Sequence, residues 1–173
     1  KAASAKKGDI IKFGGYDWRV LDVKDGKALI ITDKIIETRA YNEKFTDVTW
    51  EICDLRAYLN GEFYNSFGKS DKARVVKTKI SNKDNRQFGA PGGKDTDDYI
   101  FLLSIDEAKE YFSDFAAGVA YDSKGNLHLW WLRSPGAVNI CAAIVDSGSG
   151  FVIDAGRYVY LDGGVRPAMW LTL

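Results

Sequence analysis

The chain has 173 residues, 46% of them hydrophobic and 28% charged, which is typical of one globular domain with its own core. Its 24 basic and 24 acidic residues cancel, and the basic residues are scattered, so we expect no binding to nucleic acid. No apolar run approaches the roughly 20 residues that span a bilayer, so we expect no membrane insertion by this domain. We predict a single domain over residues 1–173, with residues 1–8 as a flexible N-terminal tail.

The first part of the chain is predicted to form a three-stranded antiparallel meander over residues 9–36. Asp25-Gly26 is a strong signal for a two-residue hairpin turn, followed by the returning strand at residues 27–32. Residues 16–23 alternate at period two. This alternation places Trp18, Val20 and Asp22 on one face of the sheet.

Two helices are predicted further along. Residues 49–60 carry apolar side chains at helical spacing, with Thr49 or Asp47 as the cap and Asn60-Gly61 as the stop. Ser104 and Glu107 form a capping box that begins a second helix through about Phe112. Between the helices we expect a long irregular loop at residues 81–98 and a short buried strand at residues 99–103.

The last third is rich in short β-forming runs separated by glycine. A strand is expected at residues 127–132, followed by further strands at 142–145, 151–153 and 158–161. The predicted fold class is α+β, mostly antiparallel short strands with two flanking helices.

Several segments resemble one bacterial domain family of unassigned function, related to the formylglycine-generating-enzyme branch of the C-type lectin fold. The resemblance rests on residues 130–136 (WWLRSPG) and 164–168 (GVRPA), supported by residues 8–21, 55–60 and 101–104. It implies a C-type-lectin-like fold in which the first and last strands pair and the late strands form a ligand-facing surface.

Some members of this family resemble the variable proteins of diversity-generating retroelements, whose randomised codons cannot encode Lys, Glu, Gln, Met or Trp. None of these five types occurs in residues 137–165, whereas residues 1–136 contain 16 Lys, 6 Glu, 1 Gln and 4 Trp. Lys and Glu are depleted in strands in any case, so an ordinary strand-rich end is the alternative. Residues 137–165 are the candidate variable, ligand-binding segment.

A ligand surface needs aromatic area and hydrogen-bonding groups on a rigid support. The segment offers such side chains, and we predict as ligand-binding residues Asn139, Ile140, Asp146, Ser147, Ser149, Phe151, Asp154, Arg157, Tyr158, Tyr160 and Asp162. The alternative is that some of these runs fill the core, which we favour for Val152 and Ile153. We assign Trp130, Trp131, Arg133, Arg166 and Trp170 to the scaffold, with the two arginines bridging backbone carbonyls.

We predict that the domain is not an enzyme and needs no cofactor. Formylglycine-generating enzymes use two neighbouring C-terminal cysteines, whereas only Cys141 lies in this region and Cys53 lies far upstream. A disulfide between these two and two unpaired thiols both remain possible. The single histidine, His128, lies in an apolar run and is interpreted as a strand residue.

Hard oxygen ligands gather in the loop at residues 81–98, which leaves a structural calcium ion as an alternative. The side chains concerned are Asn82, Asp84, Asn85, Asp95, Asp97 and Asp98. Asn and Asp also favour irregular turns through their own hydrogen bonds.

The leading hypothesis is a non-catalytic display module of the retroelement-variable type, at the cell surface or outside the cell, that binds a protein or cell-surface molecule. A fixed structural or adhesive domain and a calcium-dependent carbohydrate binder are the alternatives.

Overall fold

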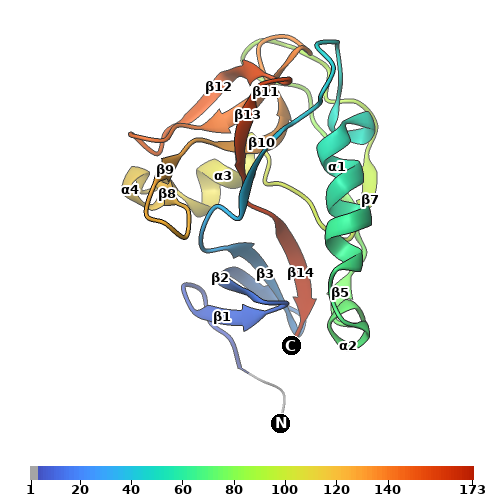
Figure 1. The fold of residues 1–173 in the computed structure, drawn as a ribbon, viewed down its shortest axis with the longest axis vertical. Helices are drawn as coiled ribbons and strands as arrows, with labels where there is room; N and C mark the ends of the chain where they lie inside the picture. The colour runs from blue at the N-terminus through green and yellow to red at the C-terminus, as the bar shows by residue number, and fades with distance from the viewer. Residues whose placement is uncertain (1–3) are drawn as a thin grey trace.

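The N-terminal meander supplies three strands of a five-stranded sheet with the order β1-β2-β3-β14-β5. The computed structural model describes residues 4–173 (Figure 1). The strands of this first sheet are β1 (Ile10–Phe13), β2 (Tyr16–Lys24), β3 (Lys27–Thr32), β5 (Val75–Val76) and β14 (Ala168–Thr172). The predicted meander is therefore confirmed.

The alternation predicted within β2 is interrupted by a bulge. Trp18 pairs with Thr32 and Val20 with Ile30, but Asp22 is opposite Leu29, so the register shifts between Val20 and Asp22. Leu21 is buried and Asp22 is not. The prediction that Asp22 shares the inward face of Trp18 is wrong, because one extra residue changes the phase of a strand.

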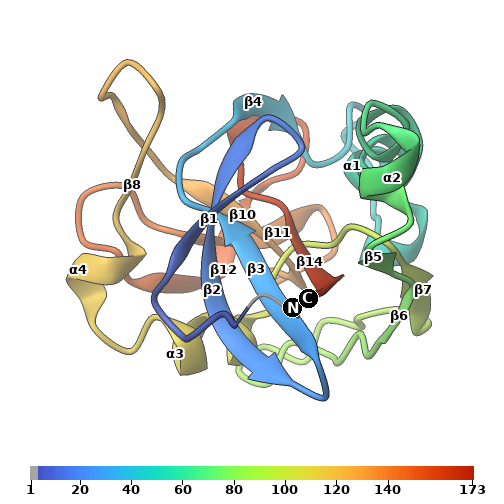
Figure 2. The same ribbon diagram turned by 90° about the horizontal axis from the view of Figure 1, so that it is seen from below.

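The chain ends meet in this sheet, but not as the resemblance implies. β14 pairs antiparallel with β3 and with β5, whereas β1 pairs only with β2. The last strand therefore lies beside the third strand rather than the first, as the view from below shows (Figure 2).

Part of the predicted N-terminal tail is attached to the same sheet. The Gly8 amide donates to the Val20 carbonyl at 2.8 Å, and the Lys6 amide donates to Asp9. Residues 1–3 of the predicted tail lie outside the described part of the chain.

The second five-stranded sheet has the order β12-β11-β10-β13-β4 and carries most of the candidate variable segment. Its strands are β4 (Glu37–Ala40), β10 (Trp130–Pro135), β11 (Cys141–Val145), β12 (Val152–Tyr158) and β13 (Asp162–Val165). The strand predicted at 151–153 is part of β12, whereas the strand predicted at 158–161 is wrong, because β12 ends at Tyr158 and residues 159–161 form a turn before β13. The two smaller sheets pair β6 (Thr78–Ile80) with β7 (Thr96–Asp98) and β8 (Ala120–Tyr121) with β9 (Leu127–His128).

The first predicted helix begins later and ends later than expected. A 3-10 turn (Trp50–Ile52) precedes α1 (Asp54–Tyr58), whose N-cap is the Cys53 sulfur rather than Thr49, and a π turn (Leu59–Phe63) then continues the helix. The prediction that Asn60-Gly61 stops the helix is wrong. A short helix α2 (Lys69–Lys72) follows.

The second predicted helix is confirmed as α3 (Ile105–Tyr111), with Phe112 as its C-cap and the Ser104–Glu107 capping box complete. It is followed by the short helix α4 (Phe115–Gly118). The segment before α3 is buried as predicted, but it forms only one isolated bridge, from Phe101 to Ala168, rather than a strand. The loop at 81–98 is irregular except for β7, which occupies its last three residues.

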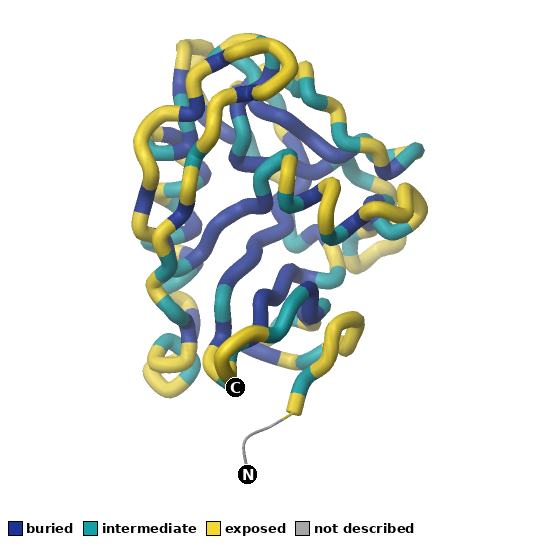
Figure 3. Tube along the Cα trace, turned by 180° about the vertical axis from the view of Figure 1, so that it is seen from behind, coloured by how far each residue is buried: buried dark blue, intermediate teal, exposed yellow. Residues whose placement is uncertain are grey.

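The core lies between the two large sheets, and tryptophans are among its largest side chains. Trp18, Trp50, Trp130 and Trp131 are fully buried, and the burial view shows buried chain along the central strands with exposed loops around them (Figure 3). The scaffold role predicted for the two arginines matches their contacts, since Arg133 donates to the Leu102 and Ser81 carbonyls and Arg166 donates to those of Thr32 and Asp33. Burial lowers the pKa of Arg166 to about 10.

The architecture is α+β, with mostly antiparallel strands and a few short helices, which confirms the predicted class at that level. Over residues 4–173, none of the helices is both long enough and apolar enough to cross a membrane.

Candidate functional site

The segment from 151 to 162 presents alternate side chains to solvent, with one change of phase. Phe151, Ile153 and Ala155 are exposed, and after Gly156 the exposed residues are Tyr158, Tyr160 and Asp162. Gly156 has a φ of +76° and lies at an irregularity in the β11–β12 pairing, which shifts the alternation. Ile153, which the sequence assigned to the core, is exposed, whereas Val152 packs against the core as predicted.

Three aromatic rings form an exposed cluster, which we name the aromatic patch: Phe45, Tyr158 and Tyr160. Their exposed fractions are 60%, 46% and 43%. The ring centroid of Phe45 lies 5.5 Å from that of Tyr158 and 5.0 Å from that of Tyr160, and the two tyrosine rings lie 6.1 Å apart. Large exposed rings that already pack on one another form a preorganised contact surface.

Phe45 reaches this patch from a different part of the chain. It lies in the connection between β4 and α1, which crosses the upper end of the molecule in Figure 1, where β13 begins. The Asn42 amide donates to the Val159 carbonyl at 3.0 Å, and the Val159 amide donates to the Ile140 carbonyl. These backbone hydrogen bonds fix the connection against the C-terminal segment.

A hollow of about 350 Å³ lies beside the patch. Tyr160 and Asp162 border it from the C-terminal segment; the other lining residues are Thr38, Arg39, Ala40, Glu43, Asp54, Leu55 and Tyr58. The Arg39 guanidinium lies 3.5 Å from the centre of the Tyr58 ring, and the Tyr58 hydroxyl donates to Glu37 at 2.8 Å. Burial and this hydrogen bond raise the pKa of Tyr58.

The remaining predicted ligand residues lie apart from the patch. Asp146 accepts from the Ser149 amide and hydroxyl, which lowers the pKa of Asp146 and closes the turn that also contains Ser147. Phe151 packs on Phe115 at 4.0 Å between ring centroids, beside a smaller hollow of about 280 Å³.

Asn139 and Arg157 support the loops near the patch. Asn139 donates to the Pro91 carbonyl at 2.9 Å, and Arg157 donates to the Asp162 carbonyl at 3.0 Å. The Ile140 carbonyl likewise accepts from the Val159 amide. In these contacts the three predicted ligand residues Asn139, Ile140 and Arg157 hold neighbouring segments of the chain in place.

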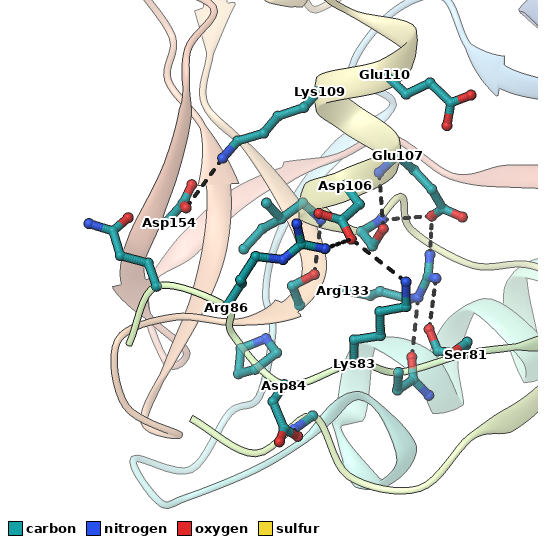
Figure 4. Close-up of a pocket in the computed structure, with 17 residues that line it drawn as sticks. Ser81, Lys83, Asp84, Arg86, Asp106, Glu107, Lys109, Glu110, Arg133 and Asp154 are labelled. Carbon is teal, nitrogen blue, oxygen red and sulfur yellow. Dashed lines mark hydrogen bonds and ion pairs between the residues drawn. The ribbon is translucent and has the colours of Figure 1, made fainter. Parts of the chain in front are cut away.

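Asp154 belongs to a third, larger cleft of about 560 Å³ between α3, the loop at 81–92 and β10 (Figure 4). Its charged groups are largely paired with one another: Lys109 with Asp154, Arg86 and Lys83 with Asp106, and Arg133 with Glu107. Such internally neutralised charges leave little net charge for a ligand.

The acidic loop at 81–98 uses its side chains to shape the chain. Asp84 accepts from the Gly92 amide, Asn85 accepts from two amides and donates to two carbonyls, and Asp98 pairs with Arg56 and Trp50. Within residues 4–173, no three Asp, Glu, His or Cys side chains are grouped so that they could hold a metal ion. The hydrogen bonds of Asp84 and Asn85 match the turn-forming interpretation of this loop.

The two cysteines lie at the N-cap of α1 and at the start of β11, and the single histidine lies at the end of β9. Both cysteines are free, which decides between the two alternatives, and burial raises the pKa of Cys53 to about 12 and also raises that of Cys141. The His128 Nε2 atom lies 2.8 Å from Asp122, and this contact lowers the pKa of Asp122.

Of the ligand-binding residues predicted from the sequence, Tyr158, Tyr160 and Asp162 lie at the aromatic patch or the hollow beside it. Sequence reasoning missed Phe45, Arg39, Glu43 and Tyr58, which lie about 100 residues upstream in segments with no ligand-binding motif. The only signal was an aromatic residue, Phe45, within the polar stretch before the first helix.

Comparison with known proteins identifies the domain but not its role. No curated protein and no solved structure matches the chain. One family matches residues 25–173, which is most of the chain from the β2–β3 hairpin to the last strand. The chain therefore belongs to the family described as a domain of unknown function, DUF6273.

Proposed function

We propose that this chain is a non-catalytic ligand-binding domain that contacts a protein or a cell-surface molecule through the aromatic patch. The observation that carries the proposal is the cluster of Phe45, Tyr158 and Tyr160, three exposed rings within 6.1 Å of one another on a strand-supported surface. Aromatic side chains are the commonest anchors of protein interfaces, since each supplies a large contact area with few rotatable bonds.

The support beneath the patch favours binding at low entropic cost. Val159 is buried between the two tyrosines, and Gly163 lies under the Trp131 ring, where a Cβ atom would come within 2.5 Å of its Nε1. A surface whose backbone is fixed before binding loses little freedom when a ligand arrives.

We further propose that the fold is C-type-lectin-like and that residues 137–165 are a variable segment of the retroelement type. The fold proposal rests on the resemblance of residues 130–136 and 164–168. The variable segment is supported by the absence of Lys, Glu, Gln, Met and Trp in that stretch and by the exposure of alternate residues from 151 to 162. A fixed adhesive domain would use the same surface. Near-copies of the gene from one genome separate the two, because only the variable domain would show differences confined to codons 137–164.

Binding itself is tested with two defined probes: an immobilised library of random hexapeptides and a glycan microarray. We expect wild-type domain to bind members of one set, and the triple variant Phe45→Ser, Tyr158→Ser, Tyr160→Ser to lose at least about tenfold in affinity. The matched control is Tyr121→Ser with Leu127→Ser, two equally exposed residues of the β8–β9 hairpin.

The triple variant should remain folded, because its three side chains are mostly solvent-exposed, and a melting curve verifies this. Failure of the wild-type domain to bind either probe set, or equal binding by the folded triple variant, would refute the proposal.

A further inference from the structure

The hollow beside the aromatic patch carries carboxylates that the fold does not use. Glu43 and Asp162 are exposed and line it, and within residues 4–173 neither side chain has an ion-pair partner within 4.0 Å. A third carboxylate, Asp54, accepts a hydrogen bond from the Glu43 amide at 2.8 Å. The backbone thus draws Glu43 and Asp54 together at one wall of the hollow.

The cations nearby are already engaged. Arg39 lines the hollow, but its guanidinium pairs with Glu37 and covers the Tyr58 ring. Arg157 donates its Nε proton to the Asp162 carbonyl. Glu37 offsets the charge of Arg39, the one cationic residue that lines the hollow, whereas three carboxylates (Glu43, Asp54 and Asp162) line it, so the hollow has a negative balance.

Aromatic rings complete the wall. Tyr160 borders the hollow and belongs to the aromatic patch. The faces of aromatic rings attract cations, and the attraction adds to that of nearby carboxylates. At about 350 Å³, the hollow lies at the lower end of the sizes typical of ligand sites.

We propose that this hollow receives the cationic side chain of a lysine or arginine from a protein ligand, while an adjacent apolar side chain of that ligand packs on the aromatic patch. This inference rests on the proposed binding function and names the chemistry of the partner. Charge complementarity selects this occupant, because an anionic group would meet Glu43 and Asp162 at close range, and a neutral hydrogen-bond donor would bind these carboxylates more weakly than a cation does.

The cation site is tested alone by amide chemical-shift titration with n-butylammonium chloride, against butan-1-ol at matched ionic strength. We expect saturable shifts at Thr38–Ala40, Glu43 and Tyr160–Asp162, with butan-1-ol binding at least about threefold more weakly. The double variant Glu43→Gln, Asp162→Asn should weaken n-butylammonium binding by about threefold or more, since each exposed ion pair is worth little by itself.

The matched control is Glu62→Gln, an exposed carboxylate outside the hollow, which should leave the titration unchanged. Equal affinity for n-butylammonium and butan-1-ol, or shifts that spread evenly over the surface, would overturn the cation site.

The hexapeptide library separates this inference from the proposed function. Enrichment of Lys or Arg beside an apolar residue, lost in the double variant but kept in Glu62→Gln, supports both. If peptides bind through the patch with no preference for Lys or Arg, only the cation site is overturned. If the wild-type domain binds no peptide, the inference that the ligand is a protein is overturned. Concentration-dependent dimers in sedimentation velocity that disappear in the double variant would assign the hollow to a second copy of the chain, and would also overturn the inference.

Discussion

Replacing Arg133 with methionine should strongly destabilise the domain, because this buried side chain donates to several acceptors at once. It is only 5% exposed and donates to the Leu102 carbonyl at 2.8 Å, to the Ser81 carbonyl at 3.1 Å and to the Asn82 side chain at 3.2 Å. It also pairs with Glu107, which belongs to the capping box of α3. Methionine keeps much of the packing volume but leaves these acceptors unpaired.

The Leu102 carbonyl, a buried acceptor left without a donor, costs about 1–3 kcal/mol, and the partly buried acceptors cost less because water in the neighbouring cleft can reach them. We therefore expect a loss of about 3–5 kcal/mol in the free energy of unfolding. For a domain of this length, a loss of that size lowers the melting temperature by roughly 10 °C. Arg133→Lys should recover little of the loss, since one ammonium group cannot reach carbonyls on two separate segments.

Thermal and urea unfolding followed by circular dichroism measure the effect. Arg86→Met is the matched control, because Arg86 lines the same cleft but its side chain is 82% exposed and pairs only with Asp106. The control should change the stability by less than about 0.5 kcal/mol. One kcal/mol corresponds to about 2–4 °C in melting temperature for a domain of this size. A melting temperature of the Arg133→Met protein within about 2 °C of the wild-type value would therefore refute the expected loss of stability.

Three further changes test other parts of the molecule. Gly156→Ala should lower the free energy of unfolding, measured in urea, by about 2–4 kcal/mol, because the φ of Gly156 is +76° and a Cβ would lie 2.2 Å from a backbone oxygen of β11. Gly125 has a φ of +83° but open space around it, so Gly125→Ala should lower the free energy of unfolding by only about 1 kcal/mol. The hydrogen bond with His128 lowers the pKa of Asp122 in the folded state. As the pH falls, the Asp122 carboxylate is therefore protonated first in the unfolded state. The stability of the fold then decreases below the ordinary carboxyl pKa of about 3.9. The melting temperatures of wild-type and Asp122→Asn protein should therefore differ more at pH 6 than at pH 3, and an equal difference at both would contradict the pKa shift. Burial raises the pKa of Cys53 to about 12, so iodoacetamide at pH 8 should modify this thiol only after unfolding, as peptide mass mapping would show.

Local chemistry made much of the fold predictable. The Asp25-Gly26 turn and the Ser104–Glu107 capping box each depend on a few atoms close in sequence, and each was found where the sequence placed it. The α+β class followed from the order of these local signals.

Features set by distant partners were not predictable. Asn60-Gly61 has the composition of a helix stop, but the Asn60 side chain accepts from the Tyr99 and Ile100 amides and donates to the Ile100 carbonyl. This contact holds the helix against a segment 40 residues away, so the chain continues through a π turn. The same limit applies to the site, since nothing in the sequence brings Phe45 beside Tyr158.

Buried and exposed positions are separated along one short stretch of the candidate site. Tyr158, Tyr160 and Asp162 are exposed, whereas Val159, which lies between the two tyrosines in sequence, and Gly163, which follows Asp162, are buried. Val159 is held by backbone hydrogen bonds and Gly163 by close contact with Trp131. Substitutions at the outward positions therefore remove few contacts that the fold needs, whereas substitutions at the inward positions disturb the junction of β4 with β13. A surface of this kind can alter its ligand by changing side chains alone, and that is the physical condition which a variable binding segment has to meet.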